Sequence, residues 1–171
     1  MVAAQLARSS GPITFSRPWS ASDLRGWIAA SPFDEPVNHV LTAVDARGRL
    51  LAGMGLREQG RVQSYRIEHV PPHIRAADLL LHVLPPDRVL RNLVVDKVWF
   101  APGHLDALRG LWQDTRWTWR DRGSNLLVTA DLRSPALDAY GLRPWSPTTR
   151  LTVAARSPVP LEQGRLFEPV L

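Results

Sequence analysis

Three titratable residues, Asp96, Glu68 and His69, are candidates for an acid–base site. Asp96 lies in the apolar run LVVDKVWF over 93–100, which predicts a buried strand. Glu68 and His69 lie near the end of VQSYRIEHV over 62–70, which predicts a strand with polar residues on one face. Neighbouring strands are about 4.8 Å apart, so side chains on one face of these two strands could share a substrate. A carboxylate or imidazole in that position could accept a proton from the attacking group.

Each candidate also has a structural interpretation that involves no chemistry. Asp96 could pair with Lys97, the only lysine in the sequence, or with a surface arginine. Glu68 and His69 could be solvated at the end of their strand. No metal site is predicted, because the histidines show no tight pairing with carboxylates on one face and the chain has no cysteine.

A predicted β-α-β unit over 93–141 must position these residues. It comprises the apolar strand and turn LVVDKVWFAPG, the helix HLDALRGLWQDTRWTWRDRG, with Gly123 expected just past its end, and the strand SNLLVTAD. Clefts in such units open at the carboxyl ends of the strands, which predicts a ligand site near Phe100–His104 and near Asp131–Ser134. Ser134 could also cap a short helix, and His104 could hydrogen-bond a ligand phosphate or cap its own helix.

The seven tryptophans separate into core and surface candidates. Trp117 falls off the apolar stripe of the central helix, which predicts an edge or a partner surface. Trp99 and Phe100 point to opposite faces of their strand, so one of them could line a ligand cavity. Trp19 and Trp145 each follow a proline, and both could close a pocket or form a homodimer contact. The stripe itself, at spacings of three and four, is expected to face the sheet and contains Leu105, Leu108, Leu111, Trp112, Thr115 and Trp119.

The remaining patterns predict one mixed α/β domain over 12–155, with terminal segments at 1–11 and 156–171. The sheet is expected to be mostly antiparallel around the central parallel β-α-β unit. The expected elements are a strand at Ile13–Arg17, a helix from about Asp23 capped by Ser20 or Ser22, an antiparallel meander over 37–70, a helix at His73–Val83, a long strand at Val89–Phe100 and a last strand at Leu151–Ala155.

Composition narrows the classes of partner and compartment. The chain has 171 residues and a net charge of +5, but its arginines are scattered singly and form no basic stripe. Nucleic-acid binding is therefore not expected, because nucleic-acid binders usually concentrate their charge on one face. No run of 18 apolar residues is present, so no membrane span is expected. The lack of cysteine agrees with a cytoplasmic location, which we take as the expectation.

The order of elements resembles that of the GNAT superfamily of N-acetyltransferases. The resemblance rests on ITFSRPWSASDL, AVDARGRLLAGMGL, VWFAPG leading into the central helix, and SPALDAYGL. It implies a GNAT-like fold and acyl transfer from acetyl-CoA to the amine of a small molecule, with Asp96 in the position of the family's carboxylate base. The residues that it implies for acetyl-CoA binding are Val98, Trp99, Phe100, Gly103, His104, Leu105 and Ser134.

The sequence also departs from the family's pattern. The family binds the pyrophosphate of acetyl-CoA through a loop of the form Arg/Gln-x-x-Gly-x-Gly/Ala, and here only Gly103 remains of that pattern. Asp106 falls in the first turn of the helix, and Leu137 stands where the family often has a tyrosine acid. Two alternatives therefore stand beside the acyltransferase: a non-catalytic interaction or regulatory domain, and a GNAT-like fold that binds or transforms another small molecule without CoA.

Overall fold

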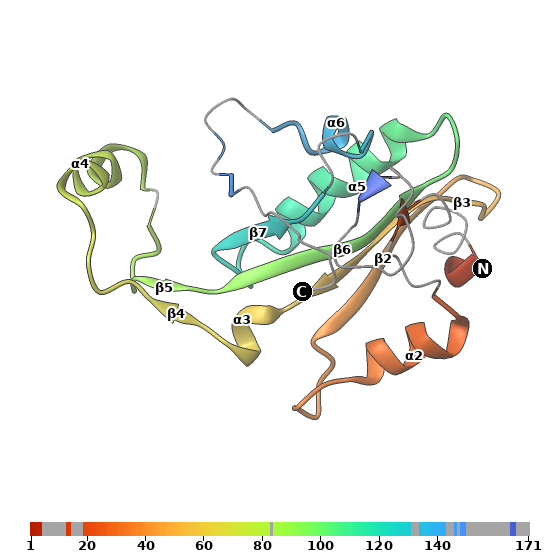
Figure 1. Ribbon diagram of the computed structural model, residues 1–171, viewed down its shortest axis with the longest axis horizontal. Coiled ribbons are helices and arrows are strands. Elements are labelled where there is room, and N and C mark those ends of the chain that lie inside the picture. Colours follow the sequence, from red (N-terminus) through yellow and green to blue (C-terminus); the bar gives the residue numbers. More distant parts are fainter. Residues whose placement is uncertain are drawn as a thin grey trace, which may run out of the picture.

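A four-stranded mixed sheet forms the body of the protein (Figure 1). Its order is β2 (Asn38–Val44), β3 (Leu50–Arg57), β6 (Asn92–Phe100) and β7 (Asn125–Val128). The β2–β3 and β3–β6 pairs are antiparallel and the β6–β7 pair is parallel. The predicted mixed α/β class and the central β-α-β unit are therefore confirmed. The computed structural model describes residues 1–4, 13–14, 19–82, 84–130, 134–142, 146, 148–149 and 165–166.

Helices cover both faces of this sheet (Figure 1). Helices α5 (Leu105–Thr118) and α6 (Leu137–Tyr140) pack on one face, where Leu108 and Trp112 meet Met54 and Val95 in the larger core. Helix α2 (Ala21–Ala29) packs on the other face, where its Leu24 and Trp27 meet Trp99 in a smaller core. The two faces of β6 therefore contribute to two separate apolar clusters.

Local sequence signals explain where α2 begins and ends. Ser20 is the N-cap and forms a reciprocal capping box with Asp23, as predicted from a serine placed ahead of the helix. At the other end, the Asn38 side chain donates hydrogen bonds to the carbonyl oxygens of Trp27 and Ala30, both at 2.8 Å. These bonds attach the end of α2 to the first residue of β2 and satisfy carbonyl groups that a helix end leaves free.

Helix α5 presents its predicted stripe to the sheet. Leu108, Trp112 and Thr115 are buried, whereas Trp117 is 71% exposed, as expected for a residue off the stripe. The helix ends before Gly123, because Trp119 is already its C-cap. Gly123 is needed for packing instead: a Cβ atom there would lie 2.5 Å from Cγ of Leu93.

The third strand of the predicted meander does not form, and an insertion takes its place. Strand β3 pairs directly with β6, and the chain between them forms α3 (Gln59–Val62), β4 (Tyr65–Arg66), α4 (Pro72–Leu81) and β5 (Val89–Leu90). Strand β4 pairs only with β5, and α4 stands away from the body at the end of this ribbon (Figure 1). We call residues 59–90 the arm. The expected long strand at 89–100 is interrupted at Arg91, whose N–H bonds to Oγ of Ser124 at 3.0 Å.

The first strand also differs from the expectation. Strand β1 (Ile13–Thr14) pairs in parallel with β8 (Arg165–Leu166) and not with the main sheet. The strand predicted at Leu151–Ala155 lies outside the described residues. Within the part of the chain that the structure describes, no helix is both long and apolar enough to cross a membrane.

Candidate functional site

A bulge in β6 places Asp96 and Lys97 together on the face that α2 covers. Gly53 pairs with Trp99 and Gly55 with Asp96, so two steps along β3 oppose three steps along β6. The extra residue of β6 is accommodated at Lys97, whose backbone adopts a left-handed conformation with φ of 50°. Bulges of this kind redirect side chains and are frequent beside active sites. Here the bulge lets two consecutive residues contribute to one cluster.

Lys97 lies in a buried cage of two indoles and one carboxylate. Its Nζ atom is 2.5 Å from Oδ2 of Asp96, 3.9 Å from the ring centroid of Trp27 and 4.6 Å from that of Trp19. The side chains of Lys97 and Asp96 are only 2% and 7% exposed. The electron-rich faces of the indoles attract the ammonium group, and this attraction is strongest when the cation is desolvated. We call these four residues the Lys97 cluster.

Glycine at position 55 makes room for this cluster. A Cβ atom on Gly55 would lie 2.5 Å from Oδ1 of Asp96 and 3.0 Å from Cη2 of Trp27. Gly53 does the same for Trp99, whose indole ring would lie 2.6 Å from a Cβ there. The two glycines of the second hairpin strand therefore allow indole rings and a carboxylate to approach the sheet backbone closely.

Burial dominates the electrostatics of Asp96. Desolvation raises the pKa of its carboxyl group, while the charge and hydrogen bond of Lys97 and the charge of Arg57 act in the opposite direction. Oδ2 of Asp96 accepts from Lys97, but its Oδ1 has no hydrogen-bond partner among the described residues. A buried carboxylate whose pKa is raised is a stronger base than an exposed one.

The parallel pairing of β6 ends next to this cluster. The pairing between β6 and β7 ends at Val95 and Val128, whereas β6 continues to Phe100. Over its last five residues β6 therefore pairs only with β3, as far as the described residues show. A crevice beyond the carboxyl ends of parallel strands is the usual binding place in α/β sheets.

The residues predicted to bind a cofactor fall into two groups. The Val98 and Trp99 side chains are buried in opposite cores and Phe100 packs against the larger core, so only their backbone is suited to meet a ligand. Gly103 has a positive φ of 79°, and exposed His104 follows it as the N-cap of α5 without a side-chain cap bond.

Leu105 and Ser134 complete the predicted set. Leu105 is half-buried at the first position of α5 and packs against the larger core. Ser134 precedes α6, where its Oγ accepts from the N–H of Ala136 at 3.4 Å and its carbonyl accepts from that of Leu137 at 3.1 Å. Its side chain is therefore occupied in the turn that starts α6.

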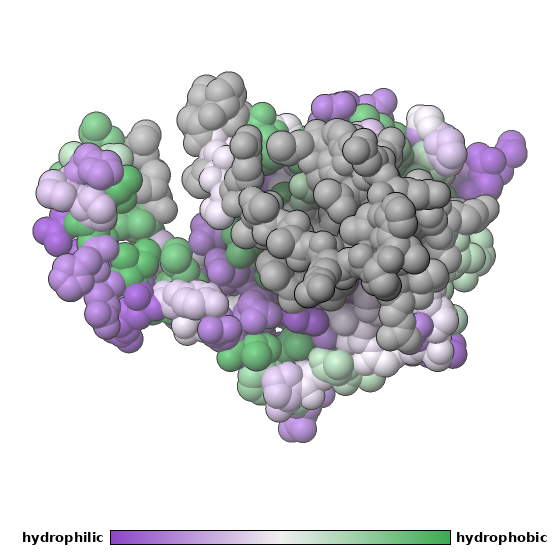
Figure 2. Space-filling view, in the orientation of Figure 1, coloured by the Kyte–Doolittle hydropathy of each residue, from purple (hydrophilic) through white to green (hydrophobic). Residues whose placement is uncertain are grey.

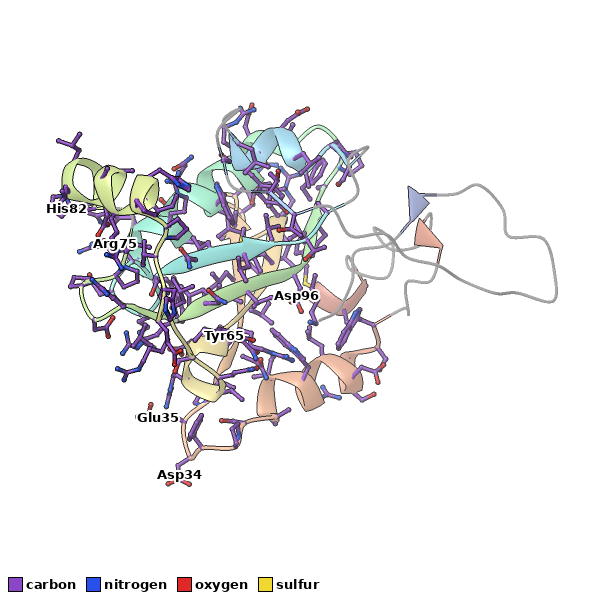
Figure 3. The ribbon with its side chains drawn as sticks, turned by 60° about the vertical axis from the view of Figure 1, so that its left-hand side comes forward. Asp34, Glu35, Tyr65, Arg75, His82 and Asp96 are labelled. Carbon is purple, nitrogen blue, oxygen red and sulfur yellow. The ribbon has the colours of Figure 1, made fainter. Side chains whose placement is uncertain are left out.

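The predicted sharing of a substrate between Asp96 and Glu68 or His69 on neighbouring strands is wrong. Glu68 and His69 are exposed residues in the segment that links β4 to α4, and the neighbours of β6 are β3 and β7. Figure 3 shows Arg75 of α4 and His82, the C-cap of that helix, at the left of the view and apart from Asp96 near its middle. The polar alternation at 62–70 resembled that of a strand, but Gln59–Val62 folds as a helical turn and breaks the run.

A second polar cluster was not predicted. Buried Glu58 accepts a hydrogen bond from Nε2 of His39 at 2.9 Å and lies 3.3 Å from Nη1 of Arg122. The His39 ring contacts that of Trp119 with centroids 4.7 Å apart. This cluster ties β2, the end of β3 and the end of α5 together. Among the described residues, no group of three or more His, Cys, Asp or Glu side chains is placed to hold a metal ion.

Comparison with known proteins found no match: no family model, curated protein or solved structure matches the chain. Sequence reasoning identified Asp96 and named Lys97 as its alternative partner, and the structure shows that pairing. It did not identify Trp27, Gly55 or Arg57 as parts of the site. The available signal was the single lysine of the chain, placed beside an aspartate in an otherwise apolar strand.

Proposed function

We propose that the protein is an acyl-CoA-dependent N-acyltransferase that moves an acetyl or other acyl group to the amine of a small molecule. The observation that carries the proposal is the position of Asp96. Its carboxylate is buried on the central strand where that strand loses its parallel neighbour, and one of its oxygens has no partner among the described residues. A carboxylate so placed is suited to take a proton from an amine.

The chemistry needs one base and one held acyl donor. The neutral amine nitrogen attacks the carbonyl carbon of the thioester, a C–N bond forms, and the C–S bond breaks with the electron pair leaving on sulfur. Asp96 takes the proton that the amine loses, and the CoA thiolate finally recovers a proton. Burial raises the pKa of Asp96 and so strengthens it as a base, while Lys97 beside it favours the ionised form.

Two structural features support a GNAT-like arrangement. The order β2-β3-β6-β7, with α5 connecting the parallel pair, agrees with the family's antiparallel strands followed by a central strand, helix and strand. The start of α5 also suits an anionic donor, because Gly103 turns the chain and no side chain caps the helix. Asp106 in the first turn pairs with Arg109 at 2.5 Å, which offsets part of its charge.

The proposal is tested by acyl transfer itself. Purified protein is incubated with acetyl-CoA and single primary amines, and free thiol and acetylated amine are measured by a colorimetric assay and mass spectrometry. Asp96→Asn should lower turnover by about 10²–10⁴-fold, with part of the loss recovered at high pH, where the amine deprotonates unaided. Asp87→Asn on the arm is the matched control and should retain full turnover. Equal turnover in both variants would remove Asp96 as the base.

The arm favours a second candidate, a non-catalytic interaction domain. Leu79 and Leu80 of α4 are 81% and 83% exposed. Apolar side chains over α4, at the left of Figure 2, are open to solvent on this face of the molecule. Exposed apolar groups of this kind can mark an interaction surface. In this alternative Asp96→Asn changes only stability, and no amine is acetylated by the wild-type protein.

A further inference from the structure

The arm carries an apolar helix face that no described part of the chain covers. Leu79 and Leu80 of α4 are 81% and 83% exposed, and Ala76, one turn before Leu80, is exposed as well. None of the α4 side chains that the structure describes is buried. A helix of 10 residues is marginal in water on its own, because most helices in proteins are stabilised by the packing of an apolar face. The described residues do not supply that packing to α4.

The root of the arm, in contrast, is fixed to the body of the protein. Glu58 immediately precedes the arm and is buried, and its Oε1 atom lies 2.9 Å from Nε2 of His39 and 3.3 Å from Nη1 of Arg122. Gly60 packs so closely on the start of β6 that a Cβ atom there would lie 2.6 Å from Cα of Arg91. A fixed root reduces the conformational freedom that the arm loses when a partner packs on it, which favours binding.

The charges of the arm indicate which kind of partner fits. Three arginines of the arm are exposed and form no ion pair with a described residue: Arg66, Arg75 and Arg88. Its carboxylates are mostly occupied, since Asp87 pairs with Arg91 at 2.6 Å. Asp78 is half-buried and accepts from a backbone N–H at 2.8 Å, which leaves Glu68 as the exposed carboxylate without a described partner. The excess of exposed arginines favours a partner with carboxylates and disfavours a second copy of the arm.

We propose that the exposed face of α4 binds an acidic amphipathic helix of another protein. Its apolar side chains pack against Leu79 and Leu80, and the small side chain of Ala76 leaves room for one of them. Arg75 lies one turn before Leu79 on the same side of α4, so a single partner helix can meet both with a carboxylate and an apolar group. Figure 1 shows α4 standing away from the sheet, where a second helix can approach it. This inference deepens the interaction role of the arm and does not depend on acyl transfer at Asp96.

Two synthetic peptides test this docking. Both are amphipathic helices with leucine at spacings of three and four, and the polar positions are glutamate in one peptide and lysine in the other. Fluorescence anisotropy of each labelled peptide is measured while wild-type protein is added. The glutamate peptide should bind saturably, and about tenfold or more tightly than the lysine peptide. Equal affinities, or no saturable binding of the glutamate peptide, would overturn the inference.

Matched variants locate the binding on α4. The double variant Leu79→Ser/Leu80→Ser and the variant Arg75→Glu should each weaken binding of the glutamate peptide by about tenfold or more. Trp117→Ala removes exposed apolar surface from α5, and Arg25→Glu makes the same charge change on an exposed position of α2, so both should bind like wild type. All these side chains are exposed, so thermal unfolding should be nearly unchanged. Equal losses in the control variants would show attraction to the net charge of the protein and overturn the inference.

Two further measurements distinguish other occupants of the arm. Sedimentation velocity that shows a wild-type dimer, dissociated by Leu79→Ser/Leu80→Ser, would identify a second copy as the occupant and overturn the inference. Binding to phosphatidylserine vesicles that depends on the same two leucines, without peptide binding, would identify a membrane surface and also overturn it. Peptide binding by a protein that does not bind acetyl-CoA would support this inference and reject the acyltransferase. Amine acetylation without peptide binding would do the reverse.

Discussion

At the scale of single residues, the site depends on an ion pair whose burial on folding costs desolvation free energy. Lys97 and Asp96 are almost fully removed from water, and a buried pair often contributes little net stability because desolvation offsets the attraction. An apolar pair at these positions would suit the strand at least as well. The bulge and the positive φ of Lys97 add backbone strain to this cost. Features that lower stability without helping to pack a core are expected where a protein binds or reacts.

The raised pKa of Asp96 gives a pH dependence with a defined sign. The folded protein retains this proton at pH values where the unfolded chain has released it, so the contribution of Asp96 to stability is largest at acid pH. That contribution is lost as the pH rises from about 4 through the raised pKa. Urea unfolding of wild type and Asp96→Asn should therefore show a stability difference, wild type minus variant, that decreases with rising pH. A difference that increases over this range would contradict the burial of the carboxyl group.

Gly55 provides a steric test of the same cluster. Gly55→Ala should lower the free energy of unfolding by about 1–3 kcal/mol, because the new methyl group overlaps Asp96 and Trp27. Gly26→Ala in α2 is the matched control and should raise stability by up to about 1 kcal/mol, since alanine favours a helix and meets no neighbour. Both values come from urea or thermal unfolding. Similar effects of the two substitutions would show that the cluster does not pack against Gly55.

At the scale of elements, periodic sequence patterns predicted single helices and hairpins correctly. The pairing of strands that are distant in sequence could not be predicted from them. The stripe of α5, the Ser20 cap and the hairpin of β2 and β3 follow from local spacing, and the structure confirms them. The helix predicted at His73–Val83 forms as α4, but its position in an arm away from the sheet was not predicted, because a polar alternating run reads as a strand whether or not a partner strand lies beside it. The bulge at Lys97 is also a property of two strands in register, and the sequence of β6 alone does not encode it.

The face of α5 can be tested with two tryptophans of one helix. Trp112→Ala should lower the free energy of unfolding by about 3–5 kcal/mol, because the ring is 5% exposed and packs in the larger core. Trp117→Ala, at 71% exposure, should change stability by no more than about 0.5 kcal/mol. Thermal unfolding of both variants measures the difference. Nearly equal melting temperatures would mean that α5 presents a different face to the sheet.

Two substitutions at the start of α5 distinguish an effect on helix stability from an effect on anion binding. His104 is the N-cap without a side-chain cap bond, so His104→Asn and His104→Asp should each stabilise the protein by about 0.5–2 kcal/mol through capping. The two variants should differ toward acetyl-CoA, because only aspartate places a negative charge where the pyrophosphate is proposed to bind. We expect weaker binding for His104→Asp than for His104→Asn in calorimetric titrations. Equal affinities would place the acyl donor elsewhere.

At the scale of the whole molecule, the sheet brings together residues that are remote in sequence. Asp96 could be selected from its strand alone, whereas its cage needs Trp19 and Trp27, which precede the hairpin and reach β6 only because α2 crosses that face. Glu68 and His69 were misplaced for the same reason, since the arm carries them away from the sheet. The fold class was therefore predictable from pattern, and the composition of the site was not.

The most direct test of the proposed function is a calorimetric titration of the wild-type protein with acetyl-CoA, paired with thermal unfolding in its presence. We expect a saturable heat with one site per chain. We also expect a gain in the free energy of unfolding of about 2.7 kcal/mol when acetyl-CoA is at about 100 times its dissociation constant. A protein that shows neither heat nor stabilisation at millimolar acetyl-CoA would contradict the assignment as an acyltransferase.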